Sequence, residues 1–119
     1  MKDLDNPILA KAFAYALRTI KLYRYLVQEK KEFTMSKELL VSGTHIGKHV
    51  MAAVNGESRQ RFTTEMGVAL RITSENEYWL HLLHFGEFLS EKELASMDWD
   101  RVEISKMLSS ITITSKANA

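Results

Sequence analysis

Apolar residues recur at alternating steps of three and four positions in four separate segments of this 119-residue chain. Such spacing gathers them on one face of a helix and is typical of helices that pack together. The chain has one proline and five glycines, so few positions interrupt a helix. The pattern predicts an all-α protein with a single domain over residues 1–119 and helices at roughly 7–28, 35–54, 59–85 and 91–113.

Each segment is preceded by a polar residue that suits a helix N-cap: Asn6, Thr34 or Ser36, Ser58, and Ser90. Ser90 and Glu93 also have the spacing of a capping box. Asn55-Gly56 is expected to end the second helix, with the glycine in the left-handed conformation, and Gly86 to end the third. Short connections of this kind favour antiparallel neighbours, and hence an up-down-up-down four-helix bundle.

Each segment has one apolar seam. In the first, the seam is read as Leu9, Phe13, Ala16, Ile20, Tyr23 and Val27. In the second it is Leu39, Gly43, Ile46, Val50 and Ala53, where Gly43 would allow close approach of a neighbouring helix. In the third it is Phe62, Met66, Ala69, Thr73, Asn76, Leu80 and Leu83. The fourth seam is interrupted by Arg101.

The third segment carries a second apolar stripe, which comprises Val68, Ile72, Trp79 and Leu82. A helix in a monomeric bundle needs only one stripe. The second stripe therefore indicates either an unusually wide core or contact with another copy of the chain. Trp79 has the character of an interface anchor, and we interpret these four residues as an oligomer interface.

Basic residues follow one face of the first segment: Lys11, Arg18, Lys21 and Arg24. Lys48 extends this set if the second helix packs alongside. Repeated around an oligomer, such a stripe would contact the phosphates of RNA or DNA. The alternative is an ordinary solvated helix face. The net charge of only +1 does not by itself indicate a nucleic-acid-binding protein.

All four histidines occur in helical pairs, His45 with His49 and His81 with His84. Each spacing places two imidazoles on one helix face, within reach of a single metal ion. A zinc or nickel site between the second and third helices would need the two pairs to face each other. The alternative is histidines at the surface or at subunit contacts, and we expect no metal and no other cofactor. The chain lacks a His-Glu-x-x-His motif, a glycine-rich phosphate loop and a nucleophile elbow. We therefore expect no catalytic residues and no enzymatic activity.

The chain has no cysteine, no apolar leader and no stretch long enough to cross a membrane. These features predict a cytoplasmic protein without a membrane partner.

Two motifs, Ser42-Gly43-Thr44-x-Ile46-Gly47 and Tyr78-Trp79-Leu80, at their mutual distance resemble the bacterial 23S rRNA intervening-sequence proteins, also called four helix bundle proteins. The resemblance covers roughly residues 8–115. It implies an antiparallel four-helix bundle that assembles as a ring-shaped homopentamer. A related branch serves diversity-generating retroelements as accessory variability proteins, which bind nucleic acid and a reverse transcriptase.

The sequence departs from this family pattern at several polar positions. His45, His49 and Ala52 replace the usual serine, asparagine and glutamate. An acidic residue usual on the third helix is Ile72 here, whereas Glu75 is retained. The polar network that these positions build in the family is therefore altered.

The sequence as a whole favours a non-enzymatic, homo-oligomeric helical scaffold of the intervening-sequence type. Its partners would be copies of itself, in a pentamer, together with RNA or DNA. The alternatives are an interaction adaptor that recruits a protein partner without nucleic acid, and a small histidine-based metal-binding bundle.

Overall fold

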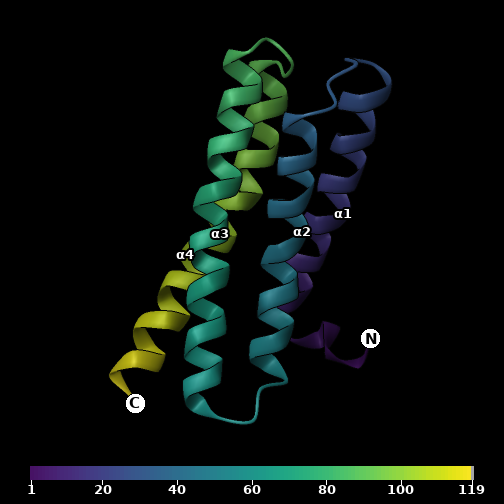
Figure 1. Ribbon diagram of the computed structural model, residues 1–119. Helices are drawn as coiled ribbons and strands as arrows, with labels where there is room; N and C mark the ends of the chain where they lie inside the picture. Colours follow the sequence, from purple (N-terminus) through teal and green to yellow (C-terminus); the bar gives the residue numbers. More distant parts are fainter. Residues whose placement is uncertain (119) are drawn as a thin grey trace.

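The computed structural model describes residues 1–118, apart from the side chains of Lys2 and Asp3 (Figure 1). A short 3-10 helix, η1 (Lys2–Asp5), precedes four α-helices: α1 (Pro7–Gln28), α2 (Met35–Val54), α3 (Arg59–Phe85) and α4 (Glu91–Ala117). The described residues form no strand, and α4 runs past the expected end at 113. No described helix is both long and apolar enough to cross a membrane.

The helices form an antiparallel up-down-up-down bundle, so the predicted fold class is confirmed. In Figure 1 the chain ascends α1, descends α2, ascends α3 and descends α4. The most extensive packing joins helices that are consecutive in sequence, and the contact between α1 and α4 is smaller. The bundle measures 46 × 26 × 21 Å.

Three of the four predicted N-caps are present. Asn6 Oδ1 accepts a hydrogen bond from the Leu9 N–H at 3.2 Å, and Ser58 Oγ accepts one from Arg61 at 3.0 Å. Ser90 and Glu93 form the expected capping box, with N–H to oxygen distances of 3.0 and 2.8 Å. These bonds satisfy backbone donors that a helix leaves unpaired.

The cap of α2 differs from the prediction. The Thr34 side chain makes no capping bond, and the Ser36 hydroxyl donates to the Glu32 carbonyl oxygen. The Glu32 carboxylate instead accepts the N–H groups of Thr34, Met35 and Ser36, the last at 2.7 Å. Burial acts to raise the pKa of Glu32, but these three donors outweigh it and hold the pKa below its usual range.

The prediction that Gly56 adopts the left-handed conformation at the end of α2 is wrong. No glycine of the described chain has a positive φ; the positive values belong to Lys31 (56°) and Glu87 (72°). Gly86 caps α3 as expected, but Glu87 makes the reversal. After this reversal the N–H of Phe88 donates to the Leu83 carbonyl oxygen at 2.9 Å. This bond satisfies one of the carbonyl groups that the end of the helix would leave unpaired.

The predicted seam of α1 is rotated from the real one. Phe13 is exposed, and its successors along the predicted seam (Ala16, Ile20, Tyr23 and Val27) are only half-buried. The buried residues of α1 are Ile8, Leu9, Ala12, Tyr15, Thr19 and Leu26. The seams of α2 and α3 are confirmed, except that Phe62 is half-buried.

A polar layer crosses the middle of the core. The Tyr15 hydroxyl donates to Asn76 Oδ1, and Asn76 Nδ2 donates to Ser42 Oγ at 3.0 Å. The three residues come from α1, α3 and α2, and all are buried. Burial raises the pKa of the Tyr15 phenol, which stays protonated and able to donate.

Candidate functional site

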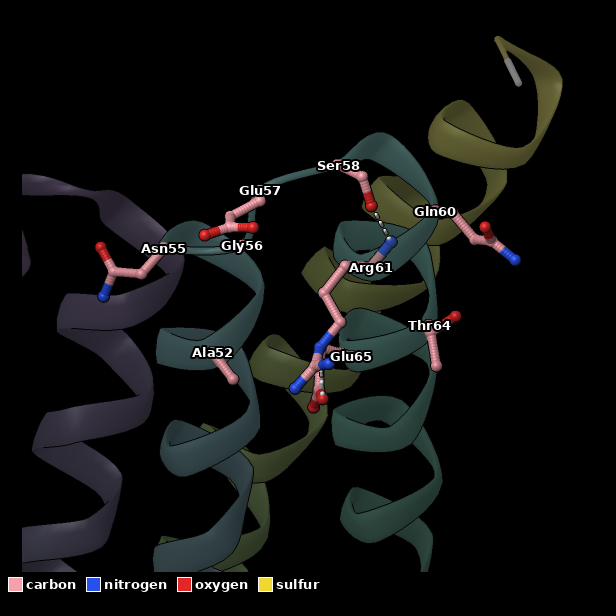
Figure 2. Close-up of a pocket in the computed structure, with 9 residues that line it drawn as sticks. All are labelled: Ala52, Asn55, Gly56, Glu57, Ser58, Gln60, Arg61, Thr64 and Glu65. Atoms are coloured by element: carbon pink, nitrogen blue, oxygen red, sulfur yellow. Dashed lines mark hydrogen bonds and ion pairs between the residues drawn. The ribbon is translucent and has the colours of Figure 1, made fainter.

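A pocket opens where α2 ends and α3 begins (Figure 2). It measures about 810 Å³, and its lining is predominantly polar: Ala52, Asn55, Gly56, Glu57, Ser58, Gln60, Arg61, Thr64 and Glu65. Figure 2 shows Arg61 reaching from the first turn of α3 toward Glu65, one turn further along. Their Nε and Oε1 atoms are 3.2 Å apart.

One histidine of the predicted set, His49, contacts Glu65, which lines this pocket. His49 Nδ1 lies 2.7 Å from Glu65 Oε2, which links α2 to α3. The bond from His49, together with the charge of Arg61, holds the pKa of Glu65 below its usual range. Burial, together with the charges of Lys48 and His49, lowers the pKa of His45. His49 and Arg61 thus both contact the Glu65 carboxylate, and the contact between His49 and Glu65 links α2 to α3 beside the pocket.

The other histidine pair lies at the opposite end of α3. His84 Nδ1 is 2.8 Å from the Leu89 carbonyl oxygen, in the α3–α4 connection. Glu65 and His84 are 19 residues apart on α3, which corresponds to about 28 Å along a helix axis. The two histidine pairs therefore do not face each other, as one shared metal ion would require.

The predicted basic stripe is interrupted by carboxylates of α4. Lys11 Nζ lies 2.8 Å from Glu103, and the hydrogen bond with that carboxylate raises the pKa of Lys11. Arg18 Nη1 lies 2.6 Å from Asp100 and also donates to the Ser96 carbonyl oxygen.

The rest of the basic stripe remains exposed. Lys21, Arg24 and Lys48 have no ion pair within the described residues. Lys21 lies beside Arg18, Tyr25 and Lys92 along a groove of about 490 Å³ between α1 and α4.

The predicted interface stripe is divided between the core and the surface. Ile72 is buried in the core of its own chain, and Val68 and Trp79 are half-buried and pack against that core. Leu82 is exposed. The outward-facing stripe of α3 is instead Tyr78, Leu82 and Phe85, spaced four and three residues apart.

Arg101, which interrupts the seam of α4, is held by two carboxylates. Its Nε donates to Asp98 Oδ1 at 2.6 Å, and its Nη2 donates to Glu77 Oε2 at 3.0 Å. The guanidinium side chain is only 7% exposed. Asp98, three residues before Arg101 on the same helix, was the available signal in the sequence, and Glu77 could be found only from the fold.

The fold and these side-chain arrangements define an up-down-up-down four-helix-bundle protein with a polar core layer. Residues 4–110 match the family model of the 23S rRNA-intervening sequence protein. The chain belongs to the 23S rRNA-intervening sequence protein family.

A solved structure supports this membership. It is the crystal structure of a protein with unknown function from the S23 ribosomal protein family, from Bacteroides thetaiotaomicron VPI-5482. It is 41% identical to this chain, has a TM-score of 0.89, and the match covers 94% of this chain and 98% of that one. A search of curated proteins found no match.

Proposed function

We propose that this protein is a non-enzymatic helical scaffold that assembles with copies of itself. The observation that carries the proposal is the outward-facing stripe of α3, where Tyr78, Leu82 and Phe85 are 59%, 38% and 77% exposed. Residues at these steps lie on one face of a helix, so their side chains form a continuous apolar surface. That surface also lines a pocket of about 430 Å³.

Other exposed apolar side chains support self-assembly. Phe13 and Leu17 lie one turn apart on α1, and Trp99 and Ile113 are exposed on α4. Single exposed apolar residues are common, but stripes of them on a monomer mark interaction surfaces. Family membership and the implied ring of five copies agree with this distribution.

The assignment as non-enzymatic is supported by how the polar side chains are used. His49 and His84 are engaged with Glu65 and with a backbone carbonyl. Among the described residues, no serine or threonine hydroxyl is hydrogen-bonded to a histidine. A hydroxyl nucleophile is usually activated by a hydrogen bond to a histidine base, and the described residues contain no such pair.

Sedimentation velocity at micromolar concentration tests the assembly. The wild-type protein should sediment at a multiple of the 13.7 kDa chain mass. The double variant Leu82→Asp/Phe85→Asp should become monomeric while its far-ultraviolet circular dichroism stays unchanged. Thr64→Asp, which adds a negative charge at an exposed position of the same helix, should leave the assembly intact. A wild-type monomer would refute the proposal.

Trp79 is a poor position for this test, although the sequence points to it. Trp79 packs against the core of its own bundle, and its ring lies edge-on to Tyr78 with centroids 5.0 Å apart. A charge at this position would destabilise the monomer itself. Loss of assembly in Trp79→Asp would therefore not distinguish a subunit contact from unfolding.

RNA or DNA association is the second function that we propose, through the groove between α1 and α4. Arg18, Lys21 and Lys92 line this groove together with Tyr25, and such a combination of cations and an aromatic ring suits phosphates and bases. Electrophoretic mobility shift with structured RNA should show binding that weakens as salt rises. Lys21→Glu/Lys92→Glu should reduce it, and Lys48→Glu should matter less. Absence of binding at low salt would favour the adaptor alternative, a scaffold that recruits only proteins.

A further inference from the structure

Three metal-ligating side chains meet between α3 and α4. Glu77 and His81 lie one turn apart on α3, and Asp98 comes from α4. One ligand atom from each residue lies within 4.8 Å of the other two. This cluster differs from either histidine pair in the sequence, because it combines one imidazole with two carboxylates from two helices.

The imidazole of His81 has an unused nitrogen. Its Nε2 atom is buried and has no hydrogen-bond partner among the described residues. His49 and His84, in contrast, each use a ring nitrogen in a bond of 2.7 or 2.8 Å. A buried imidazole nitrogen without a partner is unfavourable, and coordination of a metal ion would satisfy it.

The charges of the cluster do not cancel. Arg101 provides one positive charge, whereas Glu77 and Asp98 provide two negative charges. Arg101 bonds one oxygen of each carboxylate. Among the described residues, the hydrogen bonds of these two carboxylates involve Glu77 Oε2 and Asp98 Oδ1, and none involves Glu77 Oε1 or Asp98 Oδ2. The cluster therefore has a residual negative charge and two oxygens available to a cation.

We propose that Glu77, His81 and Asp98 bind one divalent transition-metal ion of the zinc class. An imidazole favours zinc, nickel or copper over magnesium or calcium, and carboxylate oxygens complete a three-ligand set. In a tetrahedral zinc site with bonds of about 2.1 Å, two ligand atoms lie about 3.4 Å apart, so the side chains would close by up to about 1.4 Å. Glu77 is 48% exposed and can move toward the ion. The bound ion would link α3 to α4.

Isothermal titration of the full, EDTA-treated chain with zinc chloride tests the proposal. One ion per chain should bind, and His81→Ala should weaken the affinity at least tenfold. His45→Ala is the matched control, since His45 belongs to the rival pair on α2, and it should bind zinc as the wild type does. Glu77→Gln provides a second variant that keeps the size of the side chain and should also lose affinity.

Cobalt absorption provides a readout that is independent of stability. Titration with cobalt chloride should produce ligand-field bands in the wild type and in His45→Ala, but not in His81→Ala. Circular dichroism of each variant shows whether it is folded; if His81→Ala is unfolded, Glu77→Gln decides. The proposal is overturned if the wild type binds no zinc, or if a folded His81→Ala or Glu77→Gln binds it with unchanged affinity.

Discussion

Gly43→Ala tests the closest approach between two helices. A Cβ atom at position 43 would lie 2.9 Å from Thr19 Cβ, and closer still to the Thr19 methyl and hydroxyl. Carbon atoms in contact prefer about 3.5–4.0 Å, so relieving the 2.5 Å approach to the Thr19 methyl would require α1 and α2 to separate by roughly 1.0–1.5 Å. Thr19 cannot rotate away freely, because it is fully buried and its hydroxyl donates to the Tyr15 carbonyl oxygen at 2.9 Å.

The expected magnitude follows from two opposing effects. Overpacking a core costs about 1–3 kcal/mol. Alanine in place of glycine inside a helix stabilises by about 1 kcal/mol. Because the new Cβ would meet every side-chain heavy atom of Thr19, which is buried and held by its hydrogen bond, we expect the cost to exceed the gain. Gly43→Ala should lose up to about 2 kcal/mol of unfolding free energy.

Two other glycines of the bundle are matched controls. A Cβ at Gly67 meets nothing within 4 Å, and a Cβ at Gly47 meets Ala12 at an ordinary 3.6 Å. Both alanine variants should gain about 1 kcal/mol from helix propensity alone. Urea unfolding followed by circular dichroism, at one fixed protein concentration, measures all three. If Gly43→Ala is as stable as Gly67→Ala, the close packing of α1 on α2 is not what constrains position 43.

Three further predictions use the same unfolding assay. Glu32→Gln should lose about 0.5–2 kcal/mol, because the charged carboxylate caps α2. The pKa of Glu32 is depressed in the folded state. The stabilisation by the Glu32 carboxylate is therefore present above the ordinary glutamate pKa of about 4.3 and is lost as pH falls through the lower folded value. On acidification, the wild type should lose more stability than Glu32→Gln. Asn76→Ala should lose about 2–4 kcal/mol, because it leaves Tyr15 and Ser42 without their buried partner. Ser90→Ala should lose about 1 kcal/mol through the capping box, and an unchanged midpoint would show that Glu93 alone caps α4.

Local features of the bundle could be predicted from the sequence because they depend on residues close together in the chain. A serine followed three residues later by glutamate is sufficient for the box at Ser90. The buried seams of α2 and α3 could also be predicted from the sequence, because each helix has one clearly apolar face. The cap at Glu32 was missed because its carboxylate reaches three successive N–H groups from outside the helix, an arrangement with no fixed sequence signature.

The face that α1 turns inward could not be predicted, since its apolar residues surround most of the helix. The row through Phe13 is more apolar than the row through Tyr15 and Thr19, which nevertheless faces the core. The choice depends on partners distant in sequence: Gly43 accommodates Thr19, and Asn76 accepts from Tyr15. Periodicity identifies the candidate faces, but only packing selects between them.

The candidate sites were limited by the same long-range dependence. Lys11 and Arg18 have the spacing of a basic face, but their carboxylate partners lie 92 and 82 residues further along the chain. The cluster of Glu77, His81 and Asp98 likewise exists only because α4 returns beside α3. The sequence identified His81 as a weak metal candidate but paired it with His84, which the fold commits to the Leu89 carbonyl oxygen.

The distribution of polar and apolar side chains supports assembly more strongly than any one contact. Asn76 and Arg101 are buried, and each has hydrogen-bond partners among the described residues, so these two polar groups of the core are satisfied within one chain. The large apolar side chains of Phe85 and Trp99 are nevertheless exposed on the surface of the bundle. Burying such a side chain is worth about 1.5–3 kcal/mol, which an isolated monomer would forgo. A second copy that covers the stripe of α3 would recover that free energy without changing the core, and this is why Leu82→Asp/Phe85→Asp should abolish assembly but preserve the helices.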